Sequence, residues 1–133
     1  MKAILIVDDS HTVRKLVSTA LKFGNYKLDE ACDGQEALEM ARSVKYDLVL
    51  TDHHMPNMLG IELVEALRKL ESYGSVPILI LSTESDPTLR AKSKALGATG
   101  WIQKPINPQN FDKIVLKVLN LDASATKTLE REI

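Results

Sequence analysis

The sequence contains one cysteine and almost no excess of charge of either sign. Cys32 therefore has no partner in this chain for a disulfide, and a zinc site built from several cysteines is excluded. We expect Cys32 to be a small, buried apolar residue. The 17 basic and 18 acidic residues leave a net charge of −1. Domains that bind nucleic acid usually carry a clustered basic excess, so we predict no direct binding to nucleic acid.

Long hydrophobic runs are also missing. The longest, Ala3–Val7 and Val76–Leu81, are far shorter than the roughly 20 apolar residues that a membrane-spanning helix needs. Ala3–Val7 is also too short for the apolar part of a signal peptide, and two aspartates follow it. We therefore expect a cytoplasmic protein without membrane insertion. The 133 residues are enough for one domain with its own core.

The chain does contain five segments with the composition of strands. Ala3–Val7, Leu48–Leu50 and Ile78–Leu81 are continuously apolar, as strands covered on both faces are. Tyr26–Ala31 and Thr99–Gln103 are mixed in polarity, which is typical of strands at the edges of a sheet.

Helical patterns separate these strands. Apolar residues recur at the three- and four-residue spacing that forms one stripe along a helix. The stripes are Val13, Leu16, Val17, Ala20 and Leu21; Ala37, Leu38 and Ala41; Leu63, Val64, Leu67 and Leu70; and Phe111, Ile114, Val115, Val118 and Leu119. The alternation predicts an α/β protein of the (βα)5 type, a parallel five-stranded sheet with helices on both faces.

Capping residues support these boundaries. Helix starts are predicted by acid or amide cap residues, two of them followed by proline, and left-handed helix ends are predicted by glycine. The start signals are Asp33 with Glu36, Asp86-Pro87 and Asn107-Pro108, and the end signals are Gly24 and Gly97. After residue 120 the apolar period is lost, so we expect a domain over residues 1–120 and a C-terminal tail or linker stub over 121–133.

Polar residues end four of the five predicted strands. Asp8 and Asp9 follow the first strand, Asp52 the third, Ser82 the fourth and Lys104 the fifth. In an open parallel α/β sheet, ligands bind beyond the carboxyl ends of the strands. If the first and third strands are neighbours about 4.8 Å apart, three carboxylates crowd one crevice and repel one another unless a cation binds there.

The oxygen-rich character of this cluster favours a hard ion such as Mg²⁺. Phosphoryl transfer needs a nucleophile, a metal and donors for the phosphoryl oxygens, all of which this set offers. The alternative is that the three aspartates are solvated loop acids or helix caps. One cap needs one acid, however, and not three acids at the same edge.

Several motifs, in this order and spacing, resemble the response-regulator receiver family of two-component systems. The match runs from residue 2 to about residue 120, and its opening is most like that of the single-domain chemotaxis members. The motifs are Val7-Asp8-Asp9-Ser10, Glu30 to Leu38, Asp47 to Asp52, Met55-Pro56, Gly60, Ser82 and Lys104-Pro105.

The resemblance implies a doubly wound, flavodoxin-like sheet with strand order 2-1-3-4-5. It also implies that a sensor histidine kinase transfers a phosphoryl group to Asp52. Mg²⁺ would be held by the aspartates and the backbone carbonyl of His54, and the phosphoryl oxygens would be contacted by Lys104 and Ser82. The metal ligands are then Asp8, Asp9, Asp52 and the His54 carbonyl. The Lys104-Pro105 bond would be cis, as in the family.

The same resemblance implies a conformational switch. Ser82 stands where threonine is also usual, and Trp101 stands where tyrosine or phenylalanine is commoner. These two residues would form the switch, and a downstream protein would bind the face formed by the fourth helix, fifth strand and fifth helix. Such a protein is a signalling module that catalyses its own phosphotransfer and dephosphorylation, and not an enzyme with a separate substrate.

Other functions fit the residues less well. A receiver that belongs to a larger DNA-binding or enzymatic regulator remains an alternative. A haloacid-dehalogenase-like phosphatase needs Asp-x-Asp-x-Thr after the first strand, and Asp8-Asp9-Ser10 breaks that pattern. A flavin mononucleotide carrier would place a phosphate where two carboxylates repel it. The adjacent pair His53 and His54 is a poor chelating pair, and we expect His54 to face solvent.

Overall fold

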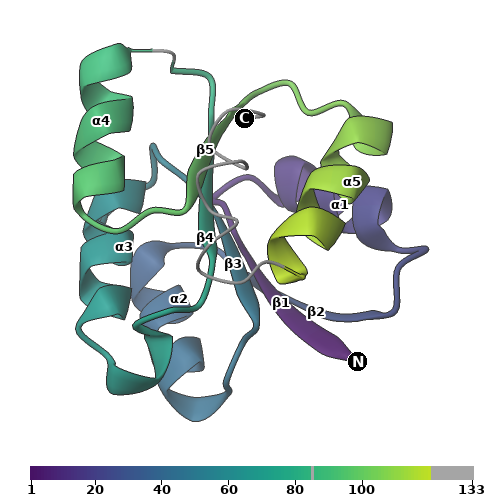
Figure 1. Cartoon of the computed structure of the whole chain (residues 1–133), viewed down its shortest axis with the longest axis horizontal. Helices are drawn as coiled ribbons and strands as arrows, with labels where there is room; N and C mark the ends of the chain where they lie inside the picture. The colour runs from purple at the N-terminus through teal and green to yellow at the C-terminus, as the bar shows by residue number, and fades with distance from the viewer. Residues whose placement is uncertain (85, 121–133) are drawn as a thin grey trace.

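The computed structural model describes residues 1–84 and 86–120; the predicted tail, 121–133, lies outside them, and the division into domain and tail stays a prediction. Five parallel strands form one sheet in the order β2-β1-β3-β4-β5, as the resemblance implied (Figure 1). The elements are β1 (Lys2–Val7), α1 (His11–Leu21), β2 (Tyr26–Ala31), α2 (Gly34–Ser43), β3 (Leu48–Asp52), α3 (Gly60–Arg68), the 3₁₀ helix η1 (Glu71–Tyr73), β4 (Ile78–Ser82), α4 (Pro87–Ala95), β5 (Gly100–Gln103) and α5 (Pro108–Leu119).

Helices cover both faces of the sheet. Figure 1 shows α1 and α5 on one side, and α2, α3 and α4 on the other. Successive side chains of a strand point to opposite faces, so β1 contributes to two cores. Ile4 and Ile6 pack with the α1 and α5 side chains, whereas Leu5 and Val7 pack with those of α2 and α3. The predicted (βα)5 architecture is therefore confirmed.

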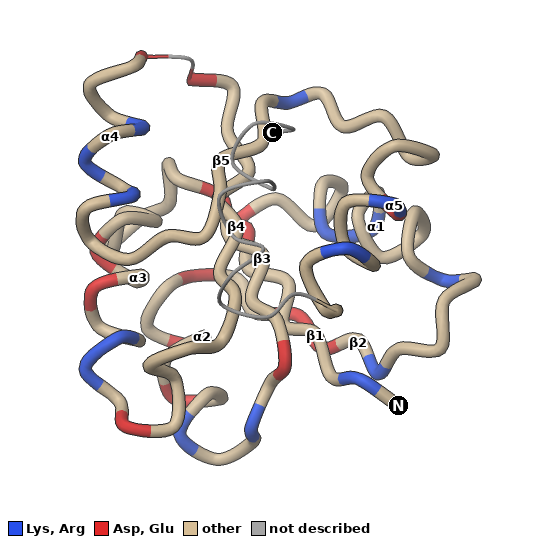
Figure 2. Tube along the Cα trace, in the orientation of Figure 1, with Lys and Arg blue, Asp and Glu red and all other residues tan. Residues whose placement is uncertain are grey.

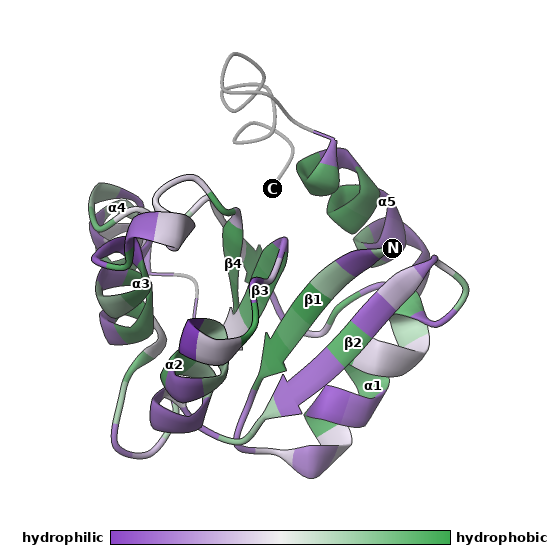
Figure 3. Cartoon of the chain, turned by 90° about the horizontal axis from the view of Figure 1, so that it is seen from below, coloured by the Kyte–Doolittle hydropathy of each residue, from purple (hydrophilic) through white to green (hydrophobic). Residues whose placement is uncertain are grey.

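The position of each strand in the sheet agrees with its composition. Every residue of β3 and β4 is buried, whereas most residues of β2 and β5 are half-buried or exposed. Figure 3 shows a similar contrast between β1, which is mostly hydrophobic, and its neighbour β2 at the sheet edge, which is more hydrophilic. The central strand β3 is two residues longer than its apolar core, Leu48–Leu50, so Asp52 is its last residue.

The three helix starts that the sequence predicted, those of α2, α4 and α5, are confirmed. The side chains of Asp33, Asp86 and Asn107 all accept hydrogen bonds from backbone N–H groups in the first turn of their helices. Glu36 completes the α2 cap by accepting from the N–H of Cys32 at 2.8 Å, one residue before Asp33. Gly97 has the predicted left-handed conformation, with φ of 111°, and the Lys104-Pro105 bond is cis.

Three local predictions were wrong. Gly24 is not a left-handed cap, because α1 closes earlier through right-handed Lys22, whose N–H bonds to the carbonyl of Thr19. The helix α3 ends at Arg68, and Leu70 instead precedes η1. Cys32 is exposed and not buried, because β2 ends at Ala31 and that residue takes the inward position. Among the described residues, no helix is long and apolar enough to cross a membrane.

Candidate functional site

Three carboxylates meet at the carboxyl edge of the sheet. Asp8 follows β1 and Asp52 ends β3, and these two strands are paired directly. One oxygen each of Asp8, Asp9 and Asp52 lies within 4.8 Å of the others. Asp8 and Asp52 are buried, at 4% and 8% exposed, whereas Asp9 is exposed. The convergence expected from the strand ends is therefore present.

Lys104 reaches the same cluster from the end of β5. Its Nζ lies 3.1 Å from Oδ2 of Asp8 and 3.2 Å from Oδ1 of Asp52. The backbone N–H of Lys104 donates to the carbonyl of Ser82 at 2.8 Å, which ties the lysine segment to the end of β4. One half-buried cation thus lies between two buried acids.

The charges in this cluster do not balance. Burial raises the pKa of Asp52 and repulsion by Asp8 raises it further, outweighing Lys104 and the N–H of His53. Burial lowers the pKa of Lys104, but the attraction of Asp52 and Asp8 is larger together and raises it. With Asp9, three acids face one lysine. The oxygen donors and the uncompensated negative charge fit a hard divalent cation such as Mg²⁺.

The two histidines after Asp52 lie in different environments. His53 is 3% exposed, and its Nδ1 has no hydrogen-bond partner among the described residues. Burial and the neighbouring His54 lower the pKa of His53. His54 is exposed, as expected, with Nε2 3.6 Å from Oε1 of Glu84. That the backbone carbonyl of His54 binds a metal ion stays a prediction.

Ser82 and Trp101 are linked through the backbone of Glu84, in the loop that follows β4. Ser82 is fully buried, and its Oγ accepts from the N–H of Glu84 at 3.1 Å. Trp101 is 3% exposed, its ring lies 5.5 Å from that of His53, and its Nε1 donates to the carbonyl of Glu84 at 3.0 Å. The backbone of Glu84 therefore joins the two predicted switch residues.

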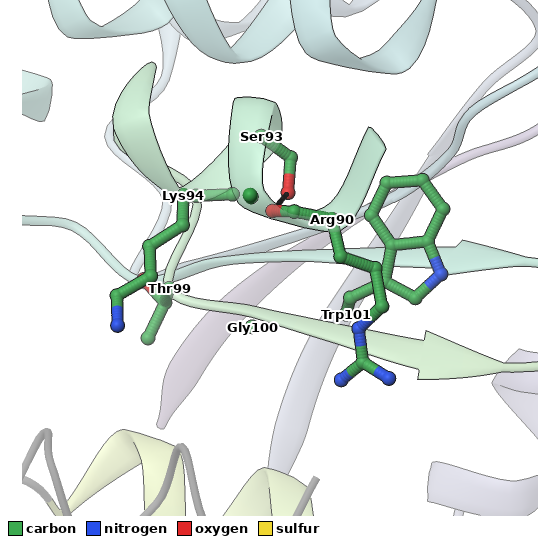
Figure 4. Close-up of a pocket in the computed structure, with 8 residues that line it drawn as sticks. Arg90, Ser93, Lys94, Thr99, Gly100 and Trp101 are labelled. Carbon is green, nitrogen blue, oxygen red and sulfur yellow. Dashed lines mark hydrogen bonds between the residues drawn. The ribbon is translucent and has the colours of Figure 1, made fainter. Parts of the chain in front are cut away.

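A cavity of about 190 Å³ opens between α4 and β5, next to Trp101 (Figure 4). Arg90, Ser93 and Lys94 line it from α4, and Thr99 and Gly100 line it from the β5 side. Figure 2 shows that α4 carries basic residues along its length. This cavity lies on the face that the sequence resemblance assigned to a downstream partner.

Arg14 is a site residue that the sequence analysis missed. It lies in α1, and its guanidinium contacts both the backbone of Asp8 and the side chain of Glu30. No local pattern marks it, because Asp8 follows β1 and Glu30 lies in β2, and the two meet only in the folded sheet.

The sheet order and the acid cluster with its lysine are those expected of a receiver domain, and comparison with known protein families confirms this class. Residues 4–116 match the response regulator receiver domain, and the chain belongs to that family. Receiver domains of two-component systems are phosphorylated by histidine kinases and act on downstream targets, and they bind Mg²⁺ at an acidic pocket.

Within the family, the chain is similar to chemotaxis proteins. It is 42% identical to Vibrio cholerae CheY4, with a TM-score of 0.85, over 89% of this chain and 98% of that one. It is 34% identical to CheY of Pseudomonas aeruginosa over 86% of this chain and 94% of that protein. It is also 34% identical to hybrid signal transduction histidine kinase D of Dictyostelium discoideum, over 89% of this chain but only 7% of that protein.

Proposed function

We propose that this protein is a response regulator that accepts a phosphoryl group on Asp52 from a histidine kinase, with Mg²⁺, and then changes conformation to control a partner protein. The observation that carries the proposal is the position of Lys104, whose Nζ lies 3.1 and 3.2 Å from two acids of a three-aspartate cluster. A nucleophile, oxygen ligands for a metal and a donor for phosphoryl oxygens thus lie in one crevice.

Each residue of the crevice has a role in this reaction. A carboxylate oxygen of Asp52 attacks the phosphorus, and the bond from phosphorus to the histidine nitrogen breaks with its electron pair left on the imidazole. Lys104 and Ser82 donate to the phosphoryl oxygens. Asp8, Asp9, Asp52 and the His54 carbonyl are the proposed metal ligands. When bound, the Mg²⁺ would neutralise negative charge on those oxygens. The activity is the protein's own phosphotransfer and dephosphorylation.

We assign the output to chemotaxis-type signalling in the cytoplasm. The chain corresponds to nearly the whole length of two chemotaxis proteins, which supports this assignment. The target would bind the face formed by α4, β5 and α5, where the cavity beside Trp101 opens. The second candidate is the receiver of a larger regulator, because the same likeness extends to a short part of a hybrid kinase.

The phosphoacceptor can be tested by labelling with radioactive acetyl phosphate and Mg²⁺. We expect acid-stable, base-labile label on the wild type, none on Asp52→Asn and none on wild type treated with a chelator. Asp112→Asn on α5 is the matched control, since it makes the same chemical change away from the crevice, and it should label normally. Undiminished labelling of Asp52→Asn would contradict the assignment.

A further inference from the structure

We propose that Arg14 is a positioning residue for the metal site, which it serves by fixing the backbone carbonyl of Asp8. The inference rests on the proposed function. Arg14 lies in the first turn of α1, and its side chain is only 15% exposed. Its Nη1 donates to the carbonyl oxygen of Asp8 at 2.6 Å, and its Nε donates to Oε1 of Glu30 at 3.1 Å. Its Nη2 lies 3.5 Å from Nδ1 of His11.

The contact with Arg14 completes the anchoring of Asp8. The N–H of Asp8 donates to the carbonyl of Ala31 at 3.1 Å, across to the end of β2. Oδ1 of Asp8 accepts from the N–H of Ser10 at 2.9 Å, and Oδ2 accepts from Lys104. With its carbonyl held by Arg14, both backbone groups and both carboxylate oxygens of Asp8 have partners. The direction of this carboxylate is therefore determined before any cation binds.

Glu30 fixes the direction of the Arg14 guanidinium, so that this cation binds the backbone of Asp8 and does not replace a metal ion among the carboxylates. Glu30 is at the end of β2, and it binds both Arg14 and Lys15, at 3.1 and 3.0 Å. A guanidinium is a planar fork whose donors lie in fixed directions. With Nε bound to Glu30, Nη1 donates to the backbone carbonyl of Asp8 rather than to its carboxylate. A lysine has the same charge but cannot make both contacts with one planar group.

An electrostatic role and a positioning role of Arg14 predict opposite changes in Mg²⁺ affinity when Arg14 is substituted. If Arg14 acted through its charge alone, its removal would make the crevice more negative and Mg²⁺ would bind more tightly. If it positions Asp8, removal loosens a ligand and Mg²⁺ binds more weakly. Loss of a residue that orients a metal ligand typically weakens metal binding by about tenfold or more.

The test is a titration of the full chain with MgCl₂, followed by ¹H–¹⁵N NMR. We expect Arg14→Met and Arg14→Lys each to raise the Kd for Mg²⁺ by about tenfold and to move the Ser10 amide signal before Mg²⁺ is added. Lys15→Met is the matched control, because it removes the same charge from the same Glu30 without a contact to Asp8. Its Kd should equal that of the wild type or be lower.

Each other outcome has a definite meaning. If Arg14→Met fails to fold, Arg14→Lys decides the question, since it keeps the charge and loses only the fork. If both variants bind Mg²⁺ as tightly as the wild type while Asp9→Asn loses binding, the proposed function stands and the role of Arg14 is overturned. A wild type that does not bind Mg²⁺ would overturn the proposed metal site, and with it this role.

Discussion

Gly60 allows α3 to pack closely against Asp52, the proposed phosphoacceptor, because it has no side chain. Its N–H donates to the carbonyl of His53 at 2.8 Å, so the first residue of α3 lies against the end of β3. A Cβ at this position would lie 2.5 Å from the carbonyl oxygen of Asp52 and 2.8 Å from Cα of His53. Both neighbours are backbone atoms, which cannot move aside as the end of a flexible side chain can.

We therefore expect Gly60→Ala to push α3 and the backbone of Asp52 apart. Overpacking of this kind costs about 1–3 kcal/mol, so the free energy of unfolding in urea should fall by that amount. The rate of phosphoryl labelling on Asp52 should fall as well. Gly74→Ala is the control, because a Cβ there meets only the carbonyl of Glu71, at 3.8 Å. If the two variants are equally stable and label equally fast, Gly60 does not set the position of Asp52.

At the scale of elements, Glu84 connects the end of β4 with β5. Its N–H donates to Ser82 and its carbonyl accepts from Trp101, so one peptide segment depends on both side chains. If a phosphoryl group on Asp52 draws the Ser82 side chain toward itself, Oγ moves away from the N–H of Glu84 and the first of these bonds is lost. The bond from Trp101 to the carbonyl of Glu84 would then no longer be held in place by Ser82. Phosphorylation would thus favour one of two conformations of the segment between β4 and α4. Residue 85 of that segment lies outside the described residues.

Trp101 is the only tryptophan, so its emission reports this coupling directly. Adding a beryllofluoride mimic of the phosphoryl group with Mg²⁺ should change the emission beyond the effect of Mg²⁺ alone. Ser82→Ala should suppress this additional change, because the hydroxyl that connects the mimic to Glu84 is missing. Thr83→Ala, which removes a neighbouring exposed hydroxyl, should leave it intact. An emission that does not respond, in protein shown by NMR to hold the mimic, would exclude Trp101 as the switch.

At the scale of the whole molecule, the acid cluster predicts that metal binding stabilises the folded state. A ligand that binds only the folded state stabilises it by about 2.7 kcal/mol when its concentration is 100 times Kd. We expect Mg²⁺ to raise the melting temperature of the wild type. Asp9→Asn should melt higher than the wild type without metal, because it removes one of three repelling charges, and it should gain less from Mg²⁺.

Glu39→Gln is a suitable control for this experiment, since Glu39 is an exposed acid of α2 outside the cluster. It removes the same unit of charge and should keep the full Mg²⁺ shift. Thermal unfolding followed by circular dichroism, with and without Mg²⁺, measures both effects. An Asp9→Asn variant that melts lower and keeps the full shift would show that Asp9 is not part of a metal site.

The sequence by itself determined the alternation of strands and helices, the edge position of β2 and β5, and the cap residues of three helices. These features depend on the period of apolar residues and on contacts between near neighbours, which a linear pattern contains. It also determined that acids stand at the ends of β1 and β3, because strand ends in a parallel sheet share one edge. The strand order came from the family resemblance and was confirmed.

Only the tertiary structure decided how those residues are held. The contacts of Arg14 with Asp8 and Glu30, and of Ser82 and Trp101 with Glu84, join residues from different elements. Cys32 is exposed because β2 ends at Ala31, one residue earlier. The sequence did not determine this end, since the edge strand and the loop after it are both mixed in polarity. Contacts between distant segments depend on packing and register, and these are properties of the assembled sheet rather than of any one segment of the sequence.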